Sequence, residues 1–194
     1  IGAGKMGGGI GQVSAQAGFQ VVLYDLTDEL VAKGLKVMDK NLSRDVEKGK
    51  RTAEEKDAIL GRIKPSTSLE DAADADLTIE AVVENMAVKS KIFSSLDSIC
   101  KPEAILASNT SSLPITEIAA VTKRPDKVIG MHFMNPVPVM RLVEVIRGLG
   151  TSDETYKVIE QASIKMGKTP VEVKDVPGFI SNRVLQVMIN EAIF

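Results

Sequence analysis

The chain has 194 residues, of which 44% are hydrophobic and 26% charged, with a formal net charge of −2 and a single cysteine. This length suits one large domain plus a fragment, and the composition is typical of a soluble globular protein with an aliphatic core. The charge argues against a nucleic-acid partner, the hydropathy against a membrane span, and the lone cysteine against an intrachain disulfide. We expect a cytoplasmic protein, and no metal site is predicted.

The first residues predict a dinucleotide-binding loop. They contain the pattern GxGxxG at Gly2, Gly4 and Gly7, followed by apolar residues at helical spacing up to Gly18. In a βαβ unit the first glycine makes a tight turn, the second lets the backbone approach a pyrophosphate, and the third lets helix and strand pack closely. The diphosphate then lies at the helix N-terminus, where free N–H groups and the helix dipole favour negative charge.

The end of the next expected strand indicates which dinucleotide binds. An apolar run over residues 19–24 ends in Asp25, where a carboxylate accepts hydrogen bonds from a ribose 2′-hydroxyl and repels a 2′-phosphate. The pattern therefore predicts NAD rather than NADP, with Lys5 and Met6 beside the same ligand. Because only Ile1 remains of the strand that should precede Gly2, we expect the chain to be a piece of a longer one.

Helices and strands then alternate. Asp28 is expected to cap a helix that runs to Leu42, and Thr52 to cap another within the charged segment 44–62. Such a segment is usually a solvated face, and contact of Arg44, Lys48 or Lys50 with a ligand phosphate is the alternative. Residues 65–68 are expected to break the helix, before a helical turn over 69–73, a buried strand over 77–83 and an amphipathic helix that ends near residue 99.

The second half continues the alternation. Strands are predicted over residues 104–107, 128–131, 142–146 and 170–173, with helices over 114–120 and 152–166. This order predicts an α/β fold with a doubly wound, mostly parallel sheet. After Pro177 and Gly178 the pattern is helical only, so we expect a domain boundary there.

Polar residues collect where the expected strands end, which is where open α/β sheets bind ligands. His132 is the only histidine of the chain and precedes a proline-stiffened loop. Hydride transfer to or from nicotinamide requires a proton to move at the substrate oxygen, and histidine suits that step near neutral pH. Glu144 is the only charge in an antiparallel-looking strand, and an imidazolium would partner it if buried. A structural histidine is the alternative.

Four motifs together resemble the 3-hydroxyacyl-CoA dehydrogenase family over essentially the whole chain, most of all its bacterial members that act on 3-hydroxybutyryl-CoA. They are IGAGKMG at residues 1–7, ASNTSSL at 107–113, GMHFMNPVP at 130–138 and PGFISNR at 177–183. The resemblance implies a Rossmann-type NAD-binding domain over residues 1–177. It also implies that residues 178–194 form the first helix of a helical C-terminal dimerisation domain, the remainder of which is missing.

The implied activity is NAD-dependent interconversion of (S)-3-hydroxyacyl-CoA and 3-oxoacyl-CoA, with a short chain preferred, in fatty acid or butyrate metabolism. A homodimer with an acyl-CoA substrate is implied as well. Two other classes stay open: a sugar-acid dehydrogenase or crystallin-like structural protein of the same fold, and a nucleotide-sensing module. A sensing module would not need a paired histidine and glutamate at the strand ends.

The resemblance also implies roles for single residues. His132 is the catalytic acid and base with Glu144 as its partner, while Ser111 and Asn182 bind the substrate. The residues expected at the cofactor, besides the glycine loop and Asp25, are Glu84, Lys89, Asn109, Ser111 and Asn135. Arg44 and Lys48 are the candidates for the CoA phosphates. A helix cap at Ser111, a turn at Asn135 and a plain polar helix position at Asn182 are the alternatives.

Overall fold

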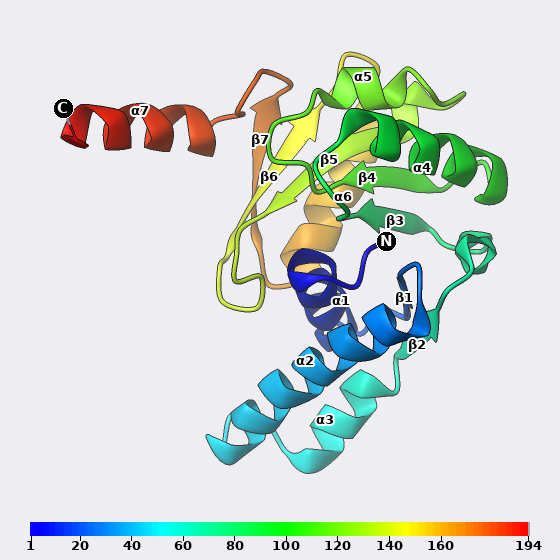
Figure 1. Cartoon of the computed structure of the whole chain (residues 1–194), viewed down its shortest axis with the longest axis vertical. Coiled ribbons are helices and arrows are strands. Elements are labelled where there is room, and N and C mark those ends of the chain that lie inside the picture. Colours follow the sequence, from blue (N-terminus) through cyan, green and yellow to red (C-terminus); the bar gives the residue numbers. More distant parts are fainter. Residues whose placement is uncertain (194) are drawn as a thin grey trace.

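Two hydrogen-bonded sheets form the centre of the computed structural model, which describes residues 1–193 (Figure 1). One joins β1 (Val21–Tyr24) to β2 (Ile63–Ser66) in parallel. The other has the strand order β3-β4-β5-β6-β7, in which only β5 and β6 run antiparallel. Its strands are β3 (Leu77–Glu80), β4 (Ile105–Ser108), β5 (Val128–Phe133), β6 (Leu142–Arg147) and β7 (Thr169–Lys174). The expected mostly parallel sheet is therefore confirmed.

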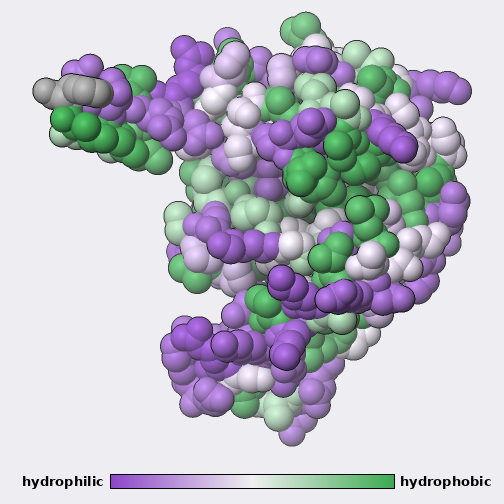
Figure 2. Space-filling model, in the orientation of Figure 1, coloured by the Kyte–Doolittle hydropathy of each residue, from purple (hydrophilic) through white to green (hydrophobic). Residues whose placement is uncertain are grey.

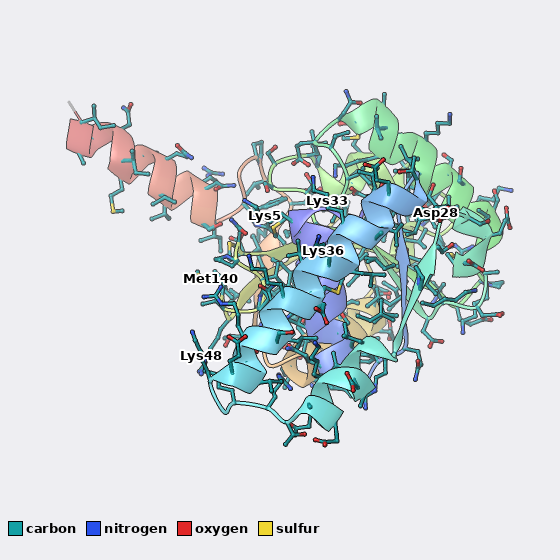
Figure 3. The ribbon with its side chains drawn as sticks, turned by 60° about the horizontal axis from the view of Figure 1, so that its bottom comes forward. Lys5, Asp28, Lys33, Lys36, Lys48 and Met140 are labelled. Carbon is teal, nitrogen blue, oxygen red and sulfur yellow. The ribbon has the colours of Figure 1, made fainter. Side chains whose placement is uncertain are left out.

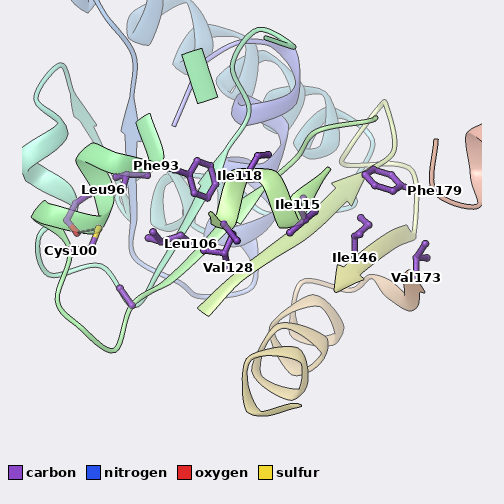
Figure 4. Close-up of a cluster of buried hydrophobic side chains, with 13 residues drawn as sticks. Phe93, Leu96, Cys100, Leu106, Ile115, Ile118, Val128, Ile146, Val173 and Phe179 are labelled. Atoms are coloured by element: carbon purple, nitrogen blue, oxygen red, sulfur yellow. Dashed lines mark hydrogen bonds between the residues drawn. The ribbon is translucent and has the colours of Figure 1, made fainter. Parts of the chain in front are cut away.

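Helices cover both faces of the larger sheet. The helices are α1 (Lys5–Gln16), α2 (Asp28–Glu47), α3 (Ala53–Leu60), α4 (Met86–Ile99), α5 (Ile115–Ala119), α6 (Asp153–Lys165) and α7 (Ser181–Ile193), with 3-10 turns at Leu69–Ala72 and Pro125–Lys127. Of these, α1 and α6 pack on one face of the larger sheet and α4 and α5 on the other. Because successive side chains of a strand point to opposite faces, neighbours in β4 join different cores. Leu106 packs with Phe93 of α4 (Figure 4), whereas Ile105 packs with Ile10 of α1. The sheet is doubly wound.

Several expected boundaries are corrected by the structure. The cap of α2 is Thr27, whose hydroxyl accepts from the Leu30 N–H, so Asp28 is the first helical residue instead. Pro65 and Ser66, expected in a break over residues 65–68, belong to strand β2 instead, and Pro65 is tolerated there because β2 pairs on one side with β1 and is an edge strand. Strand β5 extends past residue 131, so His132 lies within it. The cap at Thr52 is confirmed as a capping box.

The first two residues lie between the two sheets. The Ile1 amine donates to the Ile79 carbonyl at 2.9 Å, and the Gly2 N–H donates to the Tyr24 carbonyl at 2.8 Å. A cleft of about 630 Å³ beside Ile1 is lined by residues of β1, β2, β3, α1 and α6 and of the segments that precede β2 and β3. Neither His132 nor Glu144 lines this cleft.

Helix α7 projects away from the body of the molecule (Figure 1), and none of its described residues is buried. Apolar side chains line much of its surface in Figure 2. The exposed ones are Val184, Leu185, Val187, Met188, Ile189 and Ile193. No helix within residues 1–193 combines the length and the apolar character that crossing a bilayer would require.

Candidate active site

The three glycines of the first loop differ in how much space a side chain would find at each position. Gly2 has φ +93°, and a Cβ there would lie 2.8 Å from the Ala81 carbonyl oxygen; a Cβ on Gly7 would lie 1.8 Å from the Gly2 carbonyl oxygen. Both are required by the fold itself. A Cβ on Gly4 would meet nothing within 4 Å. Gly4 therefore keeps open space in front of the N-terminus of α1.

That helix N-terminus suits a diphosphate. Gly4 is the N-cap of α1 and supplies no side-chain hydrogen bond, and the first turn holds Lys5 but no acidic residue. The leading N–H groups of a helix have no intrahelical partners, and the helix dipole is positive at this end. The residues present thus fit the pyrophosphate of a dinucleotide.

Asp25 follows β1 and holds the glycine loop. Its Oδ2 accepts from the Ala3 N–H and its Oδ1 from the Leu26 N–H, both at 2.7 Å. A carboxylate oxygen accepts two hydrogen bonds, so each oxygen retains capacity for a ribose hydroxyl. The carboxylate consequently has a structural role in the loop and keeps acceptor capacity for the ribose that the sequence predicts there.

A buried ion pair supports the ends of β3 and β4. Glu80 is fully buried, and its carboxylate accepts from the Lys89 ammonium, the Ser108 hydroxyl and the Val82 N–H, each at 2.7 Å. Lys89 was expected to line the cofactor pocket, but its side chain is 1% exposed and also contacts Glu84 at 3.3 Å. Sequence reasoning missed Glu80, although a charged residue inside an apolar strand followed by a lysine on the next helix was a usable signal.

Glu84 organises the loop that carries Ser111. Its carboxylate accepts from the Ser111 N–H at 2.8 Å, from the Ser112 N–H at 3.2 Å and from the Thr110 hydroxyl. Burial raises the pKa of Glu84, but the hydrogen bonds from Thr110 and Ser111 and the charge of Lys89 outweigh it and leave this pKa below its ordinary value. An ionised Glu84 thereby fixes the backbone of the loop while the Ser111 side chain stays exposed.

His132 and Glu144 form a buried pair. They are direct neighbours in the antiparallel register of β5 and β6, and the His132 Nδ1 is 2.8 Å from the Glu144 Oε2. The two residues are only 6% and 2% exposed. Burial raises the pKa of Glu144, but hydrogen bonds from His132 and Ser181 lower it below its ordinary value. An ionised Glu144 requires a proton on Nδ1, which leaves Nε2 free to accept one.

Two further candidates are brought together near this pair. The Asn182 side-chain amide, in the first turn of α7, donates to the backbone carbonyl of Ser111 at 3.1 Å. This bond joins α7 to the loop that follows β4. Asn109, which is 8% exposed, accepts from the Phe133 N–H at 2.9 Å and so ties the end of β4 to the residue after His132. The side-chain oxygen of Asn109 therefore already accepts a hydrogen bond from the protein backbone.

The loop after β5 is fixed from two sides. The buried Lys168 ammonium donates to the carbonyls of Val137 and Met140, and burial lowers the pKa of this lysine. On the other side, Gly9 of α1 lies so close that a Cβ there would be 2.8 Å from the Val137 Cβ. Asn135 is exposed in this loop. Lys168 was missed because a lysine after a helix gives no sign that it will be buried.

The two basic residues expected at the CoA phosphates lie at the C-terminal end of α2. Arg44 and Lys48 are exposed at the end of the helix, and Figure 3 shows Lys48 far along α2 from Lys33 and Lys5. At 1.5 Å per residue, Lys48 is about 22 Å beyond Lys33 along the helix axis. Within residues 1–193, no group of three or more His, Cys, Asp and Glu side chains could hold a metal ion.

Comparisons with known proteins agree with this geometry. The family model for the NAD-binding domain of 3-hydroxyacyl-CoA dehydrogenase matches residues 1–176. The chain is 62% identical to the probable 3-hydroxybutyryl-CoA dehydrogenase of Bacillus subtilis, over 100% of this chain and 67% of that protein. The 3-hydroxybutyryl-CoA dehydrogenase of Clostridioides difficile is 51% identical, over 100% of this chain and 69% of its own length.

Solved structures give the same answer. The crystal structure of (S)-3-hydroxybutyryl-CoA dehydrogenase from Ralstonia eutropha matches with a TM-score of 0.97 at 50% identity, covering 99% of this chain and 68% of that one. The chain thus spans about two thirds of the length of these three relatives. The chain belongs to the 3-hydroxyacyl-CoA dehydrogenase family and carries that family's NAD-binding domain.

Proposed function

We propose that this chain interconverts (S)-3-hydroxyacyl-CoA and 3-oxoacyl-CoA, with a four-carbon acyl chain preferred. The observation that carries the proposal is the buried pair of His132 and Glu144, which leaves the imidazole Nε2 able to take up a proton. NAD, when bound, accepts the hydride from C3 of the alcohol and returns it in the reverse direction. The names of the relatives support the short-chain substrate.

The residues of the chain would supply the proton chemistry. During oxidation His132 takes the proton of the 3-hydroxyl at Nε2, and Glu144 stabilises the resulting imidazolium. Ser111 and Asn182, which the structure brings together, hold the 3-oxygen and the thioester region. In the reverse direction the protonated His132 donates to the 3-oxygen as C3 receives the hydride.

The cofactor would lie across the carboxyl ends of the strands. The N-terminus of α1 and the space at Gly4 take the diphosphate, with Lys5 and Met6 beside it, and Asp25 takes the adenine ribose. The residues around the nicotinamide end would be Glu84, Asn109, Ser111 and Asn135. The buried Lys89 would act indirectly, through its ion pairs with Glu80 and Glu84. Arg44 and Lys48 remain the candidates for the CoA phosphates.

Assembly and setting extend the proposal. Residues 178–194 would begin a helical C-terminal domain through which a homodimer forms, which the exposed apolar side chains of α7 support. The reaction would take place in the cytoplasm as part of fatty acid or butyrate metabolism, and the free, buried Cys100 suits a reducing compartment. Sedimentation of a version extended at both ends would test the dimer.

The decisive experiment is an NADH-oxidation assay on a version of the chain extended at both ends. Turnover with acetoacetyl-CoA, and none with free hydroxy acids or sugar acids in the presence of NAD, is the expected result. Turnover of sugar acids instead would reassign the substrate class. NADH binding without turnover of any of these compounds would favour a nucleotide-sensing module and contradict the proposal.

A further inference from the structure

The Glu144 carboxylate is held by four donors, and three of them come from the start of α7. Its Oε2 accepts from the His132 Nδ1 at 2.8 Å and from the Ser181 hydroxyl at 2.9 Å. Its Oε1 accepts from the Ser181 N–H at 2.8 Å and from the Ile180 N–H at 3.1 Å. The oxygen that faces the imidazole is therefore shared with one further side chain, that of Ser181.

A left-handed turn brings the start of α7 to this carboxylate. Gly178 has φ +77° and Phe179 has φ +51°, an uncommon conformation for a residue with a side chain. Phe179 is nevertheless buried, with its ring 5.8 Å from the His132 ring. The turn aims N–H groups from the leading end of α7 at Glu144, where a negative charge is favoured. The position of Ser181 is thus fixed by the buried Phe179 before it and by its own hydrogen bonds to Glu144.

We propose that Ser181 is a positioning residue that acts on His132 through Glu144: its hydroxyl takes up part of the charge on the carboxylate oxygen that faces His132. The proposal rests on the function proposed above for His132. Without the hydroxyl, Oε2 presents more negative charge to the imidazole, and protonated imidazole is stabilised further. The two backbone N–H groups would still hold Oε1, so the carboxylate would stay in place.

The surroundings of the carboxylate leave His132 as its titrating partner. Among the described residues, the neighbour of Glu144 on β7 is the apolar Val171, and α7 contributes the neutral Ser181 beside it. Arg183 is exposed two residues further on. Because His132 and Glu144 are directly hydrogen-bonded, a proton taken up at this site belongs to the pair, and a measured midpoint describes both residues.

The test compares Ser181→Val with Ser181→Thr, because valine and threonine have the same shape and differ in the hydroxyl. The first readout is the NMR titration of the His132 Cε1 proton in the untagged chain, whose one histidine gives one such resonance. We expect the valine variant to take up its proton about 0.5 to 1 pH unit higher than wild type, since a hydrogen bond to a charged group is among the stronger ones. The threonine variant should titrate like wild type.

The second readout is the pH dependence of turnover in both directions, measured on the extended protein. Oxidation needs neutral imidazole and reduction needs imidazolium, so Ser181→Val should move the acid limb of oxidation and the alkaline limb of reduction upward together. On the acid limb, oxidation should fall about three- to tenfold, because a shift of one unit is tenfold in protonation. The KM values for NADH and acetoacetyl-CoA should not change.

Ser95→Ala is the matched control, because the hydroxyl of the half-buried Ser95 of α4 donates to the Lys91 carbonyl of the same helix and takes no part in the bonds of Glu144. It should move neither readout. Ser181→Ala replaces the valine variant if circular dichroism shows that valine prevents folding. Equal midpoints in the hydroxyl-bearing and hydroxyl-free variants would overturn the role of Ser181. Absence of acetoacetyl-CoA turnover in the wild-type protein would instead overturn the proposed function. The NMR comparison would still decide the role of Ser181.

Discussion

His132 and Glu144 face each other across the one antiparallel strand pair of the larger sheet, with 2.8 Å between Nδ1 and Oε2. Residues directly opposite in such a pair have their Cβ atoms about 4.5–5.5 Å apart, which is close enough for this bond. A slip of one residue in register would turn the carboxylate to the other face of the sheet. The strand register therefore positions the pair before any ligand binds.

Replacing His132 by alanine should lower turnover by about 10²- to 10⁴-fold, which is the usual contribution of a general base. The Glu144 carboxylate would keep the donors from Ile180 and Ser181, so the fold should persist. Steady-state assays with acetoacetyl-CoA measure the loss, while fluorescence titration should show unchanged NADH affinity. Near-normal turnover would exclude His132 as the base.

The glycines of the first loop allow binding to be separated from folding. Gly4→Ala places its methyl group in open space, so the free energy of unfolding should change by less than about 0.5 kcal/mol. NADH should bind at least about tenfold more weakly, a loss of about 1.4 kcal/mol, because the methyl group occupies the approach of the diphosphate.

Gly7→Ala is the opposite case. Its Cβ would lie 1.8 Å from the Gly2 carbonyl oxygen, so the backbone must move, at a cost of about 1–3 kcal/mol. Urea unfolding and NADH titration of both variants distinguish the two roles. Equal free energies of unfolding for the two variants would contradict the claim that the fold requires Gly7 but not Gly4.

The preference for NAD should depend on Asp25. Wild type should use NADH far better than NADPH, and Asp25→Asn should reduce the ratio of the two kcat/KM values at least about tenfold, because the repulsion of a 2′-phosphate is lost. The asparagine amide can accept at only one end, so one of the N–H groups of Ala3 and Leu26 loses its acceptor, at about 1–3 kcal/mol. Asp74→Asn, at an exposed turn before β3, is the control. A wild-type protein that uses both cofactors equally would refute this role.

Much of the fold was predictable because its patterns are local. Strand and helix periodicity located β4, β6, α4 and α6 to within a residue or two, and Thr52 followed from its chemistry as a cap. Strand β2 was missed because Pro65 suggests a break, whereas on an edge strand the absent N–H costs nothing. Local patterns do not reveal which strand will lie at an edge.

The site was less predictable where it depends on distant contacts. The contact between His132 and Glu144 could be expected, since a lone charge in an apolar strand needs a partner. The donors from Ile180 and Ser181 lie more than 30 residues from Glu144 and come from a turn with two left-handed residues. Such a turn has no signature in a sequence beyond its single glycine.

Acid should weaken the folded state through Glu84 as well as Glu144. The pKa of each is lowered from an ordinary value of 4.5, so the stability that each ionised group contributes is fully present above about pH 4.5. That contribution is lost as the pH falls through the lower pKa of the folded state. The free energy of unfolding should therefore decline as the pH falls below about 4.5.

The variant Glu84→Gln measures how much of this pH-dependent stability comes from Glu84. A glutamine oxygen still accepts from the N–H groups of Ser111 and Ser112 but carries no charge and does not titrate, so the variant should be less stable than wild type at pH 6. The difference should narrow as the pH falls toward 3, because wild type then becomes protonated at the same position. Urea unfolding at pH 6, 5, 4 and 3 measures it, with Glu103→Gln, at an exposed position before β4, as the control. A difference between Glu84→Gln and wild type that stays constant over this range would show that the charge of Glu84 does not stabilise the loop.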